Sequence, residues 1–366
     1  MEQPQFLPNN WTDGVKINKN HFFDSYFNTI ENISHAALYH LTSDNYGLLE
    51  PFDTEKSNLD IDKVIHTKER VSLRLKACHA VTSYGFKIAF SSANYGENYP
   101  TATLESSNFD KNSDLTFCLL VVINPYNMVP VGTPDPEAIP LHHPHSQPKI
   151  RLEFVPQAQF NTDYLKSHYL MAGLIKWKSG SFVMDESYIP PVSRIRYHEK
   201  IHAFYEDIRK KWVELHSNCL TINKKILSKS ASNKLAENTN ILCNTVLSFI
   251  SNTHFEFRQK GHEFPPIYLA EKISILSSHI ITTLSCLPEA ERESILQYFF
   301  EWTDVQPAHF EATLWDVMNL KYNHLEIAKT ISQLQTAMGI ISALFNKMSD
   351  LEYIGQRKDN IIISQE

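Results

Sequence analysis

The sequence has few glycines, ten among 366 residues. Phosphate-binding loops cluster glycines, because only glycine lets the backbone amides approach a phosphate so closely. No P-loop, no dinucleotide-binding fingerprint and no G-x-S-x-G nucleophile elbow occurs in the chain. We therefore expect no catalytic residue, no cofactor and no enzymatic activity. A cytoplasmic enzyme with an unrecognised site in its β domain stays open as an alternative.

Close cysteine spacing is also lacking. The five cysteines are scattered and never form a C-x-x-C pair: they are Cys78, Cys118, Cys219, Cys243 and Cys286. Such a set is typical of reduced and mostly buried thiols, and it argues against a disulfide framework. The cysteines therefore favour a cytoplasmic protein.

The chain has neither an excess of positive charge nor a long apolar run. Its net charge is −7, whereas nucleic-acid-binding proteins normally carry a basic face. The first residues lack the basic flank and apolar core of a signal peptide. No run of about 18 apolar residues, the length needed to span a bilayer, is found. We expect no nucleic-acid partner and no direct membrane insertion.

Alternating apolar and polar residues in the first half of the chain predict strands. Val71, Leu73 and Leu75 alternate with polar residues, and the apolar run over 115–123 predicts a central strand. Residues 169–177 and 181–184 predict a hairpin around a Lys-Ser-Gly turn. Several short strands joined by turn residues predict a β-sandwich or barrel-like domain up to about residue 190.

A segment over residues 125–148 is rich in proline. Its prolines are Pro125, Pro130, Pro134, Pro136, Pro140, Pro144 and Pro148. They exclude a helix or a central strand and predict a long extended surface loop, which we interpret as a partner-contacting arm. His142, His143 and His145 are possible zinc or nickel ligands, but adjacent histidines beside a proline do not converge easily on one ion. We predict a polar loop and no metal site.

After Tyr188-Ile189-Pro190-Pro191 the apolar residues recur at spacings of three and four, which predicts helix after helix. The last and longest is predicted to begin at Pro307 and to reach Met348, which would be roughly 60 Å if unbroken. The predicted fold class is thus α+β and multidomain, because a chain of 366 residues exceeds one typical core. We expect a β-sandwich domain over 1–191, a helical bundle over 192–348 that can trimerise, and a short tail over 349–366.

The first fifty residues contain aromatic residues and two turns. Trp11 precedes the turn Asp13-Gly14, and His21-Phe22 opens an amphipathic run close to helical spacing. A second turn, Asn45-Tyr46-Gly47, returns the chain before Leu48. His21 could act as a general base, but no nucleophile or orienting partner is near it in sequence, so we predict a structural histidine. We interpret the set as a packing and docking device, with Trp11 and Tyr46 as possible interface anchors.

These motifs resemble the N-terminus of the TssK family, the trimeric baseplate components of bacterial type VI secretion systems. Members open with Trp-x-x-Gly-(Met or Val)-x-(Ile or Leu), followed by His-Phe and then by Asn-Tyr-Gly-Leu-Leu. The matching residues here are Trp11, Gly14, Val15, Ile17, His21, Phe22 and Asn45 to Leu49. Tyr188-Ile189-Pro190-Pro191 matches the element at which the family's β-rich shoulder passes into a helical neck. The resemblance covers residues 10 to 348.

The resemblance implies a homotrimeric structural adaptor. Its shoulder would bind the wedge proteins TssF and TssG and link them to a membrane anchor of unknown identity, at the cytoplasmic face of the inner membrane. The residues implied in partner binding or motif packing are Trp11, Asp13, Gly14, His21, Phe22, Asn45, Tyr46, Gly47, Leu48, Pro190 and Pro191. Because the family's shoulder is similar to siphophage receptor-binding proteins, a trimeric receptor-binding or adhesion protein is the alternative.

The sequence departs from the family pattern at its C-terminus. Typical members continue into a head that contacts the membrane complex, and we expect a chain of 366 residues to lack one. The chain is similar to the shorter form expected in systems of the Bacteroidetes type. Docking to a membrane complex through a head is therefore not expected.

Overall fold

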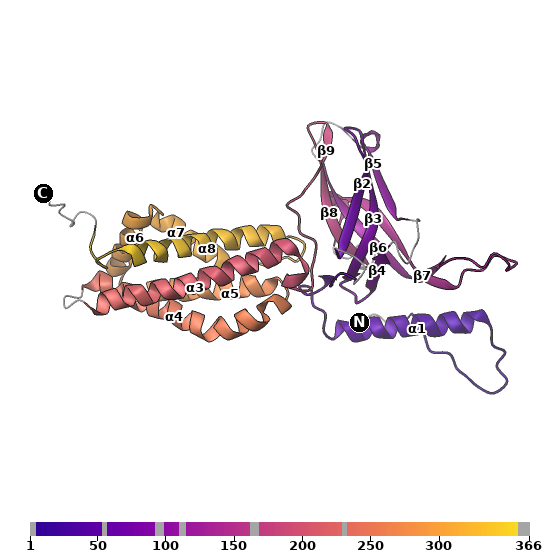
Figure 1. The fold of residues 1–366 in the computed structure, drawn as a ribbon, viewed down its shortest axis with the longest axis horizontal. Helices are drawn as coiled ribbons and strands as arrows, with labels where there is room; N and C mark the ends of the chain where they lie inside the picture. Colours follow the sequence, from indigo (N-terminus) through magenta and orange to yellow (C-terminus); the bar gives the residue numbers. More distant parts are fainter. Residues whose placement is uncertain are drawn as a thin grey trace. The chain divides into compact units, whose positions relative to one another are not determined.

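A computed structural model describes residues 5–52, 57–91, 99–109, 115–161, 168–228 and 233–357. The chain divides into two compact units, Met1–Tyr197 and His198–Glu366. The first, the β unit, contains every strand of the described residues, and the second, the helical unit, is made of helices (Figure 1). This arrangement confirms the predicted α+β class.

The β unit contains two antiparallel sheets. In the first, β3 (Arg70–Val81) pairs with all the other strands: β1 (Gly47–Leu48), β2 (Leu59–His66), β4 (Lys87–Ser91) and β5 (Thr101–Glu105). The second has the order β7 (His145–Pro156), β6 (Leu115–Val131), β8 (Tyr169–Lys178) and β9 (Ser181–Met184). The ring of Phe86, before β4, contacts Tyr126 of β6 and His168 beside β8, so apolar side chains join the two sheets as a sandwich. Short 3-10 helices cover Ser106–Asn108, Gln157–Gln159 and Ile195–Tyr197.

The proline-rich segment is the predicted loop only over residues 132–144, between β6 and β7. β6 and β7 continue into it as paired strands, with a register shift between Asn124 and Met128 and with Met128 opposite Pro148. Among the described residues, β8 accompanies β6 only as far as Val122 opposite Tyr169. Beyond Ile123, whose amide donates to the carbonyl of His168, β7 is the one neighbour of β6 among the described residues, so a proline there costs no hydrogen bond on the opposite edge. We call residues 125–148 the arm.

Helix α1 (Lys19–Leu38) packs on the β unit through one face only. Its middle is held by Phe27, whose ring contacts Tyr126 edge-on at 5.6 Å. Near its end, the buried Ser34 hydroxyl donates to the carbonyl of Tyr84 in the β3–β4 turn. The Glu31 carboxylate, also buried, accepts hydrogen bonds from the amides of Gln5 and Phe6. These bonds fix the N-terminal segment of the chain to the helix.

The helical unit contains α3 (Glu199–Leu227), α4 (Lys234–Lys260), α5 (Ile267–Ser285), α6 (Glu289–Thr303), α7 (Pro307–Met318) and α8 (Ile327–Asp350). A 3-10 turn over Gly261–Glu263 follows α4. The buried ring of Trp212 on α3 contacts Phe249 and Phe257 of α4, at 5.3 and 4.0 Å. None of the helices in the described ranges is long and apolar enough to cross a membrane.

The long last helix predicted from Pro307 to Met348 is broken into two. The helix stops at Met318 and resumes at Ile327. In between, the Asn319 amide donates to the carbonyl of Trp315, and the Asn323 side chain accepts from the amide of Leu325. Asparagine side chains that satisfy nearby backbone groups compete with a continuing helix. The break lets α7 and α8 pack against each other.

Candidate functional site

Two of the sequence motifs, distant along the chain, meet in the β unit. The amide of Leu48 donates to the carbonyl of Pro191 at 2.8 Å, and the amide and hydroxyl of Ser193 both donate to the carbonyl of Leu48. Leu48 and Val192 form an isolated parallel bridge. Pro190 and Pro191 are buried beside them. We call the contact between residues 45–49 and 188–193 the junction.

Gly47 is the residue that lets the junction close. Its φ is +110°, and a Cβ atom placed on it would lie 2.1 Å from the carbonyl oxygen of Pro191. Only glycine tolerates both the conformation and the approach. Tyr46 beside it is buried, and this burial raises the pKa of its hydroxyl. Asn45 shapes the preceding turn by accepting from the amide of Thr42 and donating to the carbonyl of His40.

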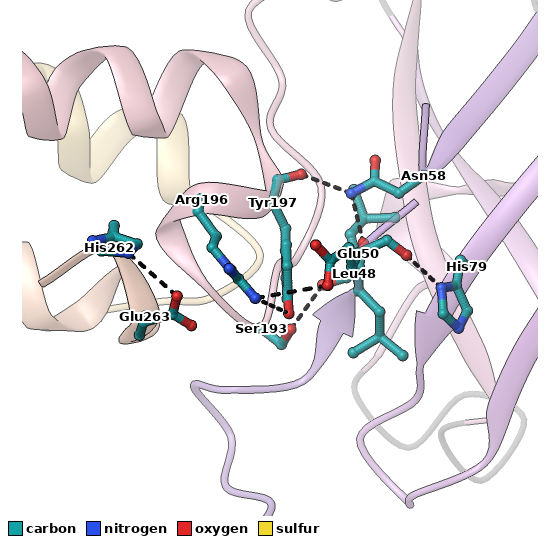
Figure 2. Close-up of polar contacts among 10 residues, drawn as sticks. Leu48, Glu50, Asn58, His79, Ser193, Arg196, Tyr197, His262 and Glu263 are labelled. Atoms are coloured by element: carbon teal, nitrogen blue, oxygen red, sulfur yellow. Dashed lines mark hydrogen bonds and ion pairs between the residues drawn. The ribbon is translucent and has the colours of Figure 1, made fainter. Parts of the chain in front are cut away.

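Two residues that the sequence analysis did not select hold the junction in place. Buried Asn58 donates from its side-chain amide to the carbonyls of Leu49 and Tyr197, at 2.9 and 2.7 Å (Figure 2). His79 hydrogen-bonds the carbonyl of Glu50 through Nδ1 and stacks on Phe52. Their positions in the sequence do not indicate this role, because Asn58 and its partner Tyr197 are 139 residues apart.

The His79 ring makes the β unit sensitive to acid. Burial lowers the pKa of His79 below its ordinary value of 6.5, against the opposing effect of the Glu50 carbonyl. The folded state therefore favours the neutral ring, and its contribution to stability is complete above pH about 6.5 and is lost as the pH falls through the lower, folded pKa. We expect the melting temperature of His79→Gln to depend less on pH than that of the wild type between pH 7 and 5. Parallel pH profiles in thermal melts would contradict this.

The opening motif forms a separate and more exposed feature. Trp11 is 53% exposed, and its ring lies 5.5 Å from that of His21. His21 completes a capping box at the start of α1 by accepting from the amide of Asn18, as expected of a structural histidine. Asp13 and Gly14 form an exposed turn. Phe22 is 64% exposed, so it does not pack within its own chain as a core residue would.

The helical unit also exposes apolar side chains in a regular pattern. Val213, Leu220 and Leu227 lie seven residues apart on the outer side of α3, and we call these three residues the seam. A groove of about 360 Å³ runs between α3 and α4 beside Val213, and Trp212 lines it. Trp212 is almost completely buried, and its indole N–H has no hydrogen-bond partner among the described residues. A seven-residue apolar repeat is typical of a helix that packs along another helix.

The histidines that the sequence offered as metal ligands do not converge in the part of the chain that the structure describes. His143 bonds the carbonyl of Gly132 within the arm, whereas His142 and His145 are exposed. The residues His198 to His202 match the zinc-protease pattern H-E-x-x-H, which the sequence analysis overlooked by taking the pattern to be absent. His198, however, is the extended N-cap of α3, so the two imidazoles do not share a helix face. Within the described ranges, no group of three or more His, Cys, Asp or Glu could hold a metal ion.

Comparison with known proteins identifies the architecture. No model of a protein family matches the chain, and no curated protein is significantly similar in sequence. A crystal structure of TssK is similar over 90% of this chain and 69% of its own, at 12% identity and a TM-score of 0.52. A chain of the type VI secretion system TssK–TssF–TssG baseplate subcomplex, solved by cryo-electron microscopy, is similar over 94% of this chain and 99% of its own, at 12% identity and a TM-score of 0.51. This chain has the fold of TssK.

Proposed function

We propose that this protein is a structural baseplate component of a type VI secretion system. It acts as a homotrimeric adaptor that binds TssF and TssG wedges and links them to a membrane anchor at the cytoplasmic face of the inner membrane. The observation that carries the proposal is the likeness of fold, along almost the whole chain, to a chain of an assembled baseplate subcomplex. The described residues hold no metal-binding cluster, and the proposed mechanism is assembly through buried surface, without turnover.

The β unit supplies the wedge-binding surface in this proposal. The junction is its internal support, because Leu48 is hydrogen-bonded to Pro191, Gly47 lies against the same carbonyl, and the two prolines at 190–191 are buried, which leaves little to a partner. Trp11 is free to act as an anchor, since aromatic side chains dominate the binding energy of protein interfaces. We assign wedge binding to Trp11 with the neighbouring turn at Asp13-Gly14.

The helical unit supplies the trimer contact. The seam of α3 presents apolar groups at the repeat that helix pairs use. Self-association through α3 would cover these apolar side chains.

Mass measurement tests the proposal directly. We expect light scattering to give a trimer of the 42.2 kDa chain, and a larger complex when TssF and TssG from the same organism are added. A trimer that ignores both wedge proteins but binds glycan or cell surfaces would favour the receptor-binding alternative. A monomer that ignores them would exclude the adaptor.

Replacing Trp11 with alanine should separate docking from folding. Because the side chain is half exposed, its loss should shift the melting temperature little, while complex formation with TssF and TssG weakens by roughly tenfold or more. Tyr39→Ala serves as the control, since Tyr39 is exposed at the opposite end of α1. Equal weakening by both variants, or a large loss of stability in Trp11→Ala, would contradict the assignment.

A further inference from the structure

Helix α1 leaves one face uncovered. The residues of this face follow one another at spacings of three, four and seven and so lie in one row along the helix: they are Lys19, Phe22, Tyr26 and Ile33, which we call the α1 stripe. Phe22 and Ile33 are 64% and 63% exposed. The side that holds the helix on the sandwich, with Glu31 and Ser34, points elsewhere. Three large apolar side chains in one exposed row indicate an interaction surface.

The arm has an apolar tip that is also uncovered. Ile139 is 98% exposed and Leu141 is 61% exposed. The tip is nevertheless ordered: the amide of Asp135 donates to the carbonyl of His142, and the Asp135 carboxylate accepts from the amide of Glu137. Figure 1 shows the β6–β7 hairpin extending beyond the rest of the sandwich. A built hairpin that presents bare apolar side chains is suited to contact a surface outside its own unit.

The two surfaces match in charge as well as in polarity. The tip carries two exposed carboxylates, Asp135 and Glu137, just before its apolar residues. The α1 stripe begins with Lys19, and the exposed Lys16 precedes it. The start of a helix also favours nearby negative charge, because the helix dipole is positive at that end. An acidic and apolar tip therefore complements a row that is basic at one end and apolar along the rest.

We propose that the arm of one protomer lies on the α1 stripe of a second copy of this chain. Within one chain both surfaces stay exposed, so the contact joins two chains. A second copy is the occupant that the structure favours, because the two complementary surfaces occur once each in every chain and repeat around a closed ring. The inference rests on the self-association in the proposed function, and it gives the β units a contact of their own besides the α3 seam.

Engineered disulfides test the contact. In a Cys286→Ser background, which removes the one exposed thiol among the described cysteines, Tyr26→Cys is combined with Ile139→Cys, and separately Phe22→Cys with Leu141→Cys. We expect mild oxidation to give bands above the 42.2 kDa monomer on a non-reducing gel. Their yield should be roughly tenfold that of the control pair Tyr26→Cys with Val183→Cys, because an assembled partner raises the local thiol concentration. Val183 is exposed on β9, away from the arm.

Charge reversal gives an independent readout. Lys19→Glu and Glu137→Lys should each lower the cross-linking yield, and the two together should restore it, since the pair then attracts again. If the protein is oligomeric but neither cysteine pair cross-links more than the control pair, the arm contact is overturned and the adaptor proposal stands. The same holds if the double charge reversal does not restore the cross-linking yield. A monomer by light scattering overturns both, so the mass distinguishes the two failures.

Discussion

Replacing Gly47 with alanine is expected to destabilise the β unit by about 3 kcal/mol or more. Two costs add. The φ of +110° is strained for any residue with a Cβ atom, and that atom would lie 2.1 Å from the carbonyl oxygen of Pro191. Neither backbone can withdraw freely, because the amide of Leu48 is bonded to the same carbonyl. Hydrogen exchange should show faster exchange of the β3 and β6 amides.

Gly14→Ala is the matched control for this variant. Gly14 also has a positive φ, +86°, but no heavy atom lies within 4 Å of where its Cβ would be. Only the backbone strain remains, about 1 kcal/mol. If the β3 and β6 amides exchange hydrogen equally fast in both variants, the junction does not limit the stability of the β unit. If these amides exchange in Gly47→Ala at the wild-type rate, Gly47 does not lie as close to Pro191 as the structure places it.

Replacing Leu220 with glutamate is expected to convert the proposed trimer into monomers. Leu220 is the central residue of the seam, between Val213 and Leu227. A carboxylate left unpaired in that contact costs about 3–5 kcal/mol, and about 1.4 kcal/mol corresponds to tenfold in affinity. The association constant should therefore fall by roughly a hundredfold or more. Light scattering over a range of concentrations measures it.

The fold of the monomer should survive this change, because the side chain at position 220 is partly exposed already. Circular dichroism and the melting temperature of the isolated monomer check it. Val64→Glu places the same charge on an exposed position of β2 and should leave the mass unchanged. A trimer of unchanged mass in Leu220→Glu would assign self-association to another surface.

Local patterns predicted those elements in which one physical signal dominates. The alternation at Val71, Leu73 and Leu75 predicts β3, and the apolar run at 115–123 predicts the first half of β6. The signal failed where tertiary context decides. Proline excludes a central strand, but β6 loses its second neighbour just where the prolines begin, and there proline is tolerated.

The candidate site was predicted in part for a similar reason. The residues around Gly47 and Pro191 were selected from a resemblance, yet nothing in their spacing indicates that they touch. Asn58 and His79 lack any pattern, since their partners are backbone carbonyls, which every residue has. The helical seam was missed among the many apolar residues of α3, because a sequence does not tell a buried leucine from an exposed one.

The junction also sets an order for folding. The hydrogen bond from Ser193 to Leu48 spans 145 residues, and contacts of such long range form slowly, because the intervening chain must first be brought together. During synthesis Leu48 leaves the ribosome long before its partners do. Every described strand of the two sheets precedes Ser193 in the chain, so all of them are synthesised before the junction can close. A ribosome stalled ahead of Ser193 would therefore hold a β unit in which the junction is still open.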